Sequence, residues 1–404
     1  MRGQVGKLRL LFISLLDFSS FNERNIYTDL LREFIRRGHD VYCISPVERR
    51  NKVNTHLREN GHLLKLKIGN TQKTNIIEKG ISTLMIEPLF KRAIRKYFAD
   101  VKFDLILYST PPITFANVVK YVKRRDGARS YLMLKDIFPQ NAVDLGMMPT
   151  TGLKGLLHKH FRNKEKELYS LSDRIGCMSQ ANVDYILKHN PEIPKEKVEI
   201  CPNCIEVQDM RLSEQERKDM RDKYGLPQGK KIFVYGGNLG KPQCVPFIIS
   251  CLKKCADLAD VYFVIAGNGT DRYLLEKYMA EEKPAHVKLF GELPKEAYDA
   301  MIACCDVGLI FLDHRFTIPN FPSRLLVYMQ AGLPVLASTD PNTDIGTVLM
   351  NGGFGKYCES ICESNVKRCI CEFTQDNLRE MGEKAYLYLE SHYGVEGACQ
   401  AVLK

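Results

Sequence analysis

Apolar runs alternate with amphipathic segments along the first half of the chain. The run KLRLLFISLL (7–16) predicts a buried strand. The segment NIYTDLLREFIRRGHD that follows places Ile26, Leu30 and Phe34 on one helical face, and we expect this helix to stop at Gly38. Further strands are predicted in VYCISPV, FDLILYST, ARSYLMLKDI and DRIGCMS, with helices between them. Strands separated by helices favour a parallel, doubly wound α/β sheet.

A polar segment at about residues 205–228 interrupts this pattern, which then starts again. The new strands are predicted in IFVYGGNLG, VYFVIAGNG, VKLFGEL, VGLIFL and PVLAS. We therefore expect two Rossmann-like domains, residues 1–205 and 206–385, followed by a helical tail, residues 386–404. Such paired domains bind ligands where the carboxyl ends of their strands face a common cleft.

Charge separates the two halves of the chain. Of the 58 Lys and Arg and 48 Asp and Glu, residues 1–200 hold 35 and 21, which leaves +14, whereas residues 201–404 hold 23 and 27, which leaves −4. A basic surface attracts nucleic acid or an anionic membrane. Because no nucleic-acid motif accompanies the charge, we expect no nucleic-acid partner.

Targeting signals and metal motifs are not evident in the sequence. No apolar run reaches about 18 residues and no signal-peptide pattern precedes the first strand, so we expect a chain that neither spans a membrane nor is exported. The 14 cysteines then lie in a reducing compartment. CPNC and CESIC lack a second well-spaced ligand pair, so we predict no metal site.

Three glycine-containing strand exits suggest an anion site in the second half. They are YGGNLGK, AGNG and FGEL, and Lys241 of the first supplies a positive charge. Glycine lets backbone N–H groups approach a ligand closely. Turn glycines are common in any doubly wound sheet, but three in one domain favour a nucleotide-type ligand. None fits G-x-G-x-x-G, which disfavours an NAD site.

The stretch IPNFPSRLLVYMQAGLPVLAS predicts a loop, a short helix and a buried strand. Pro322 suits the first turn of the helix, and Ser323 lies beside its free N–H groups. Helical spacing puts Arg324 and Val327 on one face. Arg324 could pair with a phosphate, or it could be an ordinary surface residue.

In combination these motifs resemble the donor half of glycosyltransferase family 4. A second resemblance is carried by two segments of the first half, DLILYSTPPITFANVV and LMLKDIFPQNAVDLGMM. These segments are similar to the branch of the family that builds bacterial surface polysaccharides and includes fucosaminyltransferase-like members. The resemblance implies a GT-B fold whose C-terminal helix packs back on the first domain. It implies a retaining, metal-free glycosyltransferase without a cofactor, using a nucleoside-diphosphate-sugar, with UDP favoured. The implied acceptor is a polyprenyl-diphosphate-linked glycan of capsule or O-antigen assembly.

Mapped onto this sequence, the resemblance implies a donor site in the second domain. Its residues would be Gly237, Asn238, Lys241, Gly267, Asn268, Gly291, Glu292, Arg315, Pro322, Ser323, Arg324 and Val327. Two departures stand out, because Pro319 and Val327 occupy the positions of the family's paired glutamates, the second of which holds the donor ribose. Whether the loss of both carboxylates alters the choice of donor or abolishes activity is left open by the sequence.

In the first domain, Lys135 and Asp136 occupy the end of the fourth strand, where members of the family often place a His that faces the sugar, so the resemblance implies that these two residues are catalytic. Asp136 could orient the acceptor hydroxyl or take its proton, or it could simply cap a turn. Asp17 and Arg24, after the first strand, are acceptor-side candidates.

Two basic amphipathic segments suggest an anionic membrane partner. PLFKRAIRKYF carries Phe90, Ile94 and Phe98, and GLKGLLHKHFRNKEK carries Leu153, Leu156, Leu157 and His160. Such helices can lie on anionic lipid or pack on the sheet. We expect a cytoplasmic enzyme, peripheral on the inner face of the plasma membrane. A catalytically degenerate nucleotide-sugar-binding or scaffold protein and a GT-B-like UDP-sugar epimerase remain alternatives.

Overall fold

The computed structural model describes residues 6–71 and 74–404, which form two compact units. Unit 1 comprises the chain up to Ile205 together with Val395–Lys404, and unit 2 comprises Glu206–Gly394. The chain therefore returns to unit 1 at Val395. The predicted tail began at residue 386, which is too early, because helix α14 (Leu378–His392) continues within unit 2.

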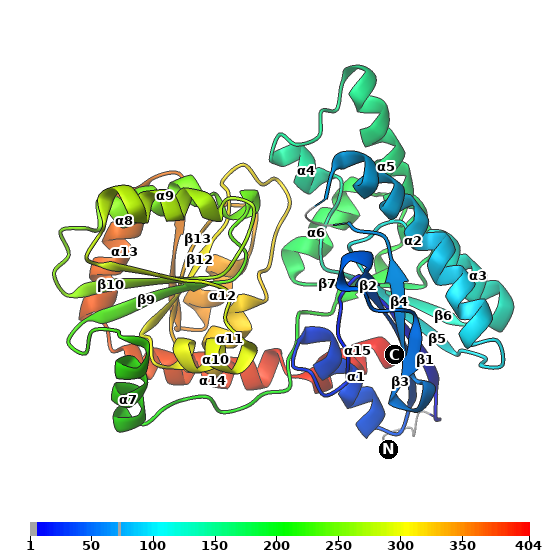
Figure 1. Cartoon of the computed structure of the whole chain (residues 1–404), viewed down its shortest axis with the longest axis horizontal. Helices are drawn as coiled ribbons and strands as arrows, with labels where there is room; N and C mark the ends of the chain where they lie inside the picture. Colours follow the sequence, from blue (N-terminus) through cyan, green and yellow to red (C-terminus); the bar gives the residue numbers. More distant parts are fainter. Residues whose placement is uncertain (1–5, 72–73) are drawn as a thin grey trace. The chain divides into compact units, whose positions relative to one another are not determined.

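Unit 1 is built on an eight-stranded sheet of order β3-β4-β2-β1-β5-β6-β7-β8, parallel except for the β3–β4 pair. Its strands are β1 Arg9–Ile13, β2 Asp40–Glu48, β3 His56–Arg58, β4 Leu63–Ile68, β5 Leu105–Ser109, β6 Arg129–Leu134, β7 Arg174–Cys177 and β8 Val198–Ile200. Its helices are α1 Ile26–Arg36, α2 Ile76–Tyr97, α3 Ala116–Asp126, α4 Gln140–Asp144, α5 Gly152–Leu171, α6 Gln180–His189 and α15 Val395–Leu403. Helices α2, α3 and α5 lie side by side (Figure 1).

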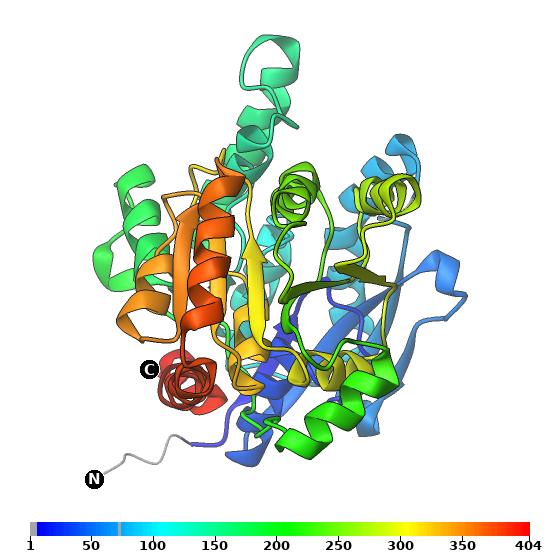
Figure 2. The same cartoon turned by 90° about the vertical axis from the view of Figure 1, so that its left-hand side faces the viewer.

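Unit 2 has a parallel six-stranded sheet of order β11-β10-β9-β12-β13-β14. Its strands are β9 Lys231–Gly236, β10 Val261–Ala266, β11 Val287–Phe290, β12 Val307–Phe311, β13 Val335–Thr339 and β14 Gly355–Glu359. Besides α14, its helices are α7 Glu214–Tyr224, α8 Val245–Lys254, α9 Arg272–Glu282, α10 Lys295–Ala303, α11 Arg324–Gln330, α12 Ile345–Asn351 and α13 Glu363–Gln375. Figure 2 shows α8, α9 and α13 across one face of this sheet.

Local sequence explains where the elements begin. Asn25 and Thr28 form a capping box at the start of α1, and Ser213 and Glu216 form another at the start of α7. Strands β5, β12 and β13 are buried at every residue because helices cover both sheet faces. Two Rossmann-like domains with parallel sheets were predicted, and this architecture is confirmed.

Candidate functional site

Two glycine loops pack against each other at the carboxyl ends of β9 and β10. The backbone N–H of Gly237 donates to the Ala266 carbonyl at 2.9 Å, and that of Leu239 donates to the Asn268 carbonyl at 2.9 Å. Gly267 has φ +146°, and a Cβ there would lie 1.9 Å from the Gly237 carbonyl oxygen. Only glycine fits at this position, so the two loops form one fixed backbone wall.

Arg324, the first residue of α11, lies beside this wall. Its Cζ is 4.5 Å from the centroid of the Tyr235 ring, and a Cβ on Gly237 would lie 3.4 Å from the same Cζ. Its Nη1 is buried and has no hydrogen-bond partner within the described part of the chain. A buried guanidinium donor with no acceptor is costly, and a phosphate oxygen would satisfy it.

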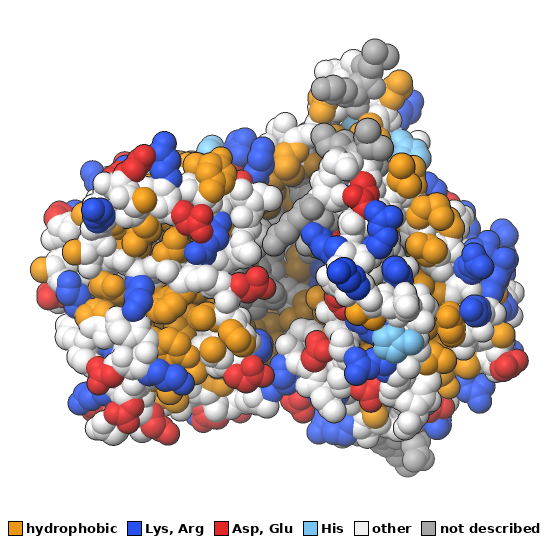
Figure 3. All heavy atoms as spheres, in the orientation of Figure 1, with side chains coloured by type: hydrophobic (Ala, Val, Ile, Leu, Met, Phe, Trp, Pro, Cys, Tyr) orange, Lys and Arg blue, Asp and Glu red, His pale blue; other side chains and the backbone are white. Residues whose placement is uncertain are grey.

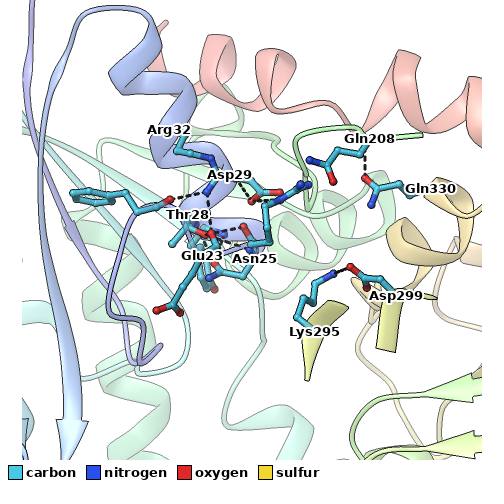
Figure 4. Close-up of polar contacts among 12 residues, drawn as sticks. Glu23, Asn25, Thr28, Asp29, Arg32, Gln208, Lys295, Asp299 and Gln330 are labelled. Atoms are coloured by element: carbon cyan, nitrogen blue, oxygen red, sulfur yellow. Dashed lines mark hydrogen bonds and ion pairs between the residues drawn. The ribbon is translucent and has the colours of Figure 1, made fainter. Parts of the chain in front are cut away.

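Tyrosine side chains hold this corner of unit 2 rigid. The Tyr328 hydroxyl accepts from the Gly236 N–H at 3.0 Å and donates to the Leu309 carbonyl at 3.1 Å, which joins α11 to β9 and β12. Tyr235 donates to the Asn238 carbonyl at 2.5 Å. At the other end of α11, Gln330 accepts the backbone N–H of Gln208 at 3.0 Å (Figure 4). The Arg324 backbone is therefore fixed from both ends of its helix.

Val327 follows Arg324 by one turn, and both are half-buried on a helix whose other residues are buried. Pro319, the second position that lacks the expected glutamate, is buried. Helix α11 begins at Arg324, so Pro322 and Ser323 precede its first turn and do not lie within it. The wall beside Arg324 is therefore apolar where relatives were expected to carry carboxylates.

The remaining donor candidates differ in how far their groups are already engaged. Asp313 binds the Arg315 guanidinium at 2.7 Å, and the Asn238 amide donates to Gln243 at 2.9 Å. The Asn268 side chain accepts the Gly269 N–H at 2.9 Å. Pro322 is half-buried, whereas the exposed candidates are Asn238, Lys241, Asn268, Gly291, Glu292, Arg315 and Ser323. The structure thus groups Gly237, Asn238, Gly267, Asn268 and Arg324, while the charge of Arg315 is matched by Asp313.

In unit 1, Asp136 follows β6 and accepts two hydrogen bonds from the Asn141 amide at 2.7 and 2.8 Å. Burial raises the pKa of its carboxyl to about 6, although the Ile137 N–H and Asn141 lower it in part. Such a pKa suits proton transfer near neutral pH. The Lys135 ammonium donates instead to the Cys201 carbonyl at 3.3 Å, and burial lowers its pKa.

The two acceptor-side candidates have ionic partners within unit 1. Asp17 pairs with Lys65, a buried side chain that also donates to the Phe18 carbonyl at 2.7 Å. The Nε of Arg24 is 3.4 Å from Asp29, which Arg32 also binds at the start of α1 (Figure 4). Both candidates therefore brace the loop after β1.

Sequence reasoning missed the residues that position the site. Tyr235, Tyr328 and Lys65 act through contacts with residues far away in the chain. Asn141 and Asp313 gave a local signal, because Asn141 follows Asp136 by five residues and Asp313 precedes Arg315 by two.

The predicted membrane segments separate into a buried and an exposed part. Phe90, Ile94 and Phe98 are buried, so the prediction that this face of α2 could lie on lipid is wrong, since it packs on the sheet. On α5, Leu156 is 66% exposed and Leu157 is 53% exposed, and His160 is exposed. The side chain of Leu153 lies outside the described residues. Within the described residues, no helix combines the length and apolarity needed to cross a bilayer.

Comparisons with known proteins match a different family model to each of the two units. Residues 25–209 match the model of Glycosyltransferase Family 4, and residues 216–344 match that of Glycosyl transferases group 1. Over 329 residues, the chain is 22% identical to the probable glycosyltransferase WbjE of Pseudomonas aeruginosa, covering 81% of this chain and 80% of WbjE.

Two further similarities involve a shorter matched segment and a solved structure. The chain is also 25% identical over 255 residues to WcaI of Escherichia coli K12, a candidate colanic acid biosynthesis glycosyl transferase. The matched segment covers 61% of this chain and 60% of WcaI. The structure of HepE from Anabaena, in complex with UDP and glucose, is similar with a TM-score of 0.69 and 13% identity, covering 98% of both chains.

Proposed function

Because this chain is a glycosyltransferase of the family 4/group 1 type with the GT-B fold, we propose that it moves a sugar, with retention, from a nucleoside-diphosphate-sugar to a lipid-linked glycan. UDP-sugars are the favoured donors. The pathway would be bacterial capsule or O-antigen assembly, in the branch that includes fucosaminyltransferase-like members. WbjE, WcaI and the UDP complex of HepE support this reading.

The observation that carries the donor proposal is the buried, unsatisfied Nη1 of Arg324 beside the Gly237 loop. Charge develops on the diphosphate as the bond from the sugar C1 to its oxygen breaks. A guanidinium held in place before the reaction stabilises that charge without reorganisation. Lys241 would add a second positive charge from the exposed end of the same loop, so no metal ion is required.

The new C1–oxygen bond forms to an acceptor hydroxyl on the face that the diphosphate leaves. The hydroxyl proton passes to the departing diphosphate, which balances the reaction. We assign Asp136 the role of orienting that hydroxyl, since its carboxylate is fixed by Asn141 and half-buried. With a pKa of about 6, it is ionised at neutral pH.

We further propose a cytoplasmic enzyme that is peripheral on the inner membrane. The exposed Leu156 and Leu157 of α5 and the basic first half of the chain support this proposal. Figure 3 shows hydrophobic and basic side chains mixed on this part of the surface.

A panel of UDP-, GDP- and dTDP-sugars tests the proposal, first by thermal stabilisation and then by transfer to a lipid-linked glycan extract. We expect stabilisation by one nucleotide class and release of that nucleoside diphosphate only when acceptor is present. Stabilisation without any transfer would favour the binding or scaffold alternative. Conversion of the UDP-sugar without acceptor would favour the epimerase alternative.

A further inference from the structure

A basic groove runs between α2 and α3 on unit 1, and no candidate site residue lines it. Its volume is about 410 Å³, and its cationic lining residues are Lys91, Arg95, Lys120, Arg124 and Arg125, placed around Tyr121. Within the described part of the chain, no carboxylate lines the groove. Figure 3 shows the basic side chains gathered over this region.

Two of these cations are neutralised and three are not. Glu167 binds Lys120, and Asp126 binds Arg125 through two hydrogen bonds of 2.6 and 2.7 Å. For Lys91, Arg95 and Arg124, no carboxylate lies within 4.0 Å among the described residues. The nearby Glu87 is engaged by the Asn117 amide at 2.8 Å.

The Tyr121 ring gathers these like charges. The Lys91 Nζ lies 5.5 Å from the ring centroid and the Arg95 Cζ lies 4.9 Å from it. Cation–π attraction of this kind contributes about 0.5–1 kcal/mol each at exposed sites, while the like charges of the cations repel one another. An anion in the groove would remove that repulsion, and a phosphate would offer several acceptor oxygens to Arg and Lys donors.

The same face of α2 carries an apolar residue. Leu84 precedes Lys91 by seven residues and Arg95 by eleven, so the three follow one stripe of the helix. Leu84 is 73% exposed. An exposed apolar side chain in line with unneutralised cations matches the boundary between headgroups and acyl chains of a bilayer.

We propose that the α2–α3 groove binds the phosphate of an anionic lipid headgroup and is the electrostatic membrane contact of unit 1. This inference rests on the proposed action at a membrane. It assigns the membrane contact of α2 to the groove residues, because the Phe90 face of the helix is buried. The groove is separate from the donor loops, so its loss leaves nucleotide binding intact.

The test compares two triple variants with equal charge loss. The groove variant is Lys91→Gln/Arg95→Gln/Arg124→Gln. The matched control is Arg92→Gln/Lys96→Gln/Lys102→Gln, three exposed cations that do not line the groove. Binding is measured by co-sedimentation with vesicles of phosphatidylcholine containing about a third phosphatidylglycerol. We expect the groove variant to lose about a hundredfold in partitioning, since each of its three cations contributes about fivefold, and the control to lose less than tenfold. Equal losses in both variants would overturn the proposal.

A second arm separates a lipid phosphate from a soluble one. Calorimetry with inorganic pyrophosphate is expected to show no saturable binding to the groove. Tight pyrophosphate binding that the groove variant abolishes, with vesicle binding unchanged, would assign the groove to a soluble ligand and overturn the membrane contact. UDP affinity reports the donor site separately, and we expect it to be equal in wild type and both variants. If none of the three proteins binds UDP and only the groove variant loses vesicle binding, the donor proposal fails and the groove proposal stands.

Discussion

Arg324 combines burial, a ring contact with Tyr235 and an unsatisfied Nη1. We predict that Arg324→Ala weakens UDP binding by about ten- to a hundredfold, because a hydrogen bond to a charged group contributes about 1.5–3 kcal/mol. Arg324→Lys keeps the charge but loses the planar fork, so it should recover only part of the affinity. Isothermal titration with UDP measures both. Arg315→Ala is the comparison, since Asp313 already binds that side chain. An equal loss of UDP affinity in Arg315→Ala would contradict the proposal that Arg324 binds the phosphate.

Val327 lies one turn beyond Arg324 where relatives were expected to carry a ribose-binding carboxylate. If the rest of the pocket keeps the geometry of relatives, Val327→Glu adds a charge-assisted hydrogen bond and should raise UDP-sugar affinity by about tenfold or more. Val327→Gln, which has the same length without the charge, is the control. A fall in affinity for both variants would mean that the pocket has been rebuilt around an apolar wall.

Asp136 makes activity and stability depend on pH in opposite ways. Its folded pKa of about 6 lies above the ordinary value, so the transfer rate should rise as pH passes through 6. Folded stability from this group is complete below pH 4 and is lost as pH rises through 6, because the buried carboxylate must then be charged. Asp136→Asn should therefore slow transfer by about a hundredfold yet stabilise the fold at pH 8 by up to about 3 kcal/mol, and not at pH 4.

Rate profiles and thermal melts of Asp136→Asn at pH 4 and 8 measure these effects. The exposed Asp100→Asn serves as the comparison in unit 1. A rate that does not change between pH 5 and 7, together with equal melting of the wild type and Asp136→Asn at pH 8, would remove Asp136 from the site.

At the scale of elements, the glycine loops after β10 and β11 should respond very differently to the same substitution. Gly267→Ala places a methyl 1.9 Å from the Gly237 carbonyl at a φ that alanine rarely adopts, so the wall must shift. We expect a loss of several degrees in melting temperature together with lost UDP binding. Gly291→Ala is the matched control, because no atom lies within 4 Å of its added methyl. Near-native UDP binding by Gly267→Ala would show that the wall does not shape the donor site.

An element could be predicted from the sequence where the residues that determine it are close together in the chain. The strands β9, β10, β12 and β13 follow from continuous apolar runs, and α1 follows from its spacing and Gly38. The edge strands β3 and β14 were not predicted, since β3 is exposed at every residue and β14 is buried only at Cys358. The membrane face of α2 was misjudged because helical spacing shows which residues share a face but not what covers it.

The site follows the same rule. Glycine turns and the position of Arg324 could be predicted from motifs that lie within a few residues. The pairing of Lys65 with Asp17 could not, because the two residues are far apart in the chain. The pairing of Asp313 with Arg315 is local and was missed, although it decides whether the charge of Arg315 remains available for a ligand. Asn141 fixes the orientation of the Asp136 carboxylate, whereas burial at the strand end raises the pKa of that carboxyl.

At the scale of the whole molecule, the chain leaves unit 1 at Ile205 and returns to it with α15. Helix α15 contributes to the core that α1 and β1 form, through Val395, Ala398, Cys399 and Val402. This helix is therefore part of the core of unit 1. Each unit then has its own core, and their unfolding need not coincide. A ligand of unit 2 would raise the transition of that unit alone.

We predict that Val402→Asp destabilises unit 1 by about 3 kcal/mol or more, because it buries an unpaired charge where Val402 is now enclosed. Glu396→Gln, on the exposed side of the same helix, should cost less than about 1 kcal/mol, since its ion pair with Arg36 lies at the surface. Calorimetry with and without UDP separates the two units. The transition that UDP raises should be unchanged by Val402→Asp, while the other moves down. If Val402→Asp instead lowers the UDP-sensitive transition, the two units do not unfold independently and α15 does not act as part of unit 1 alone.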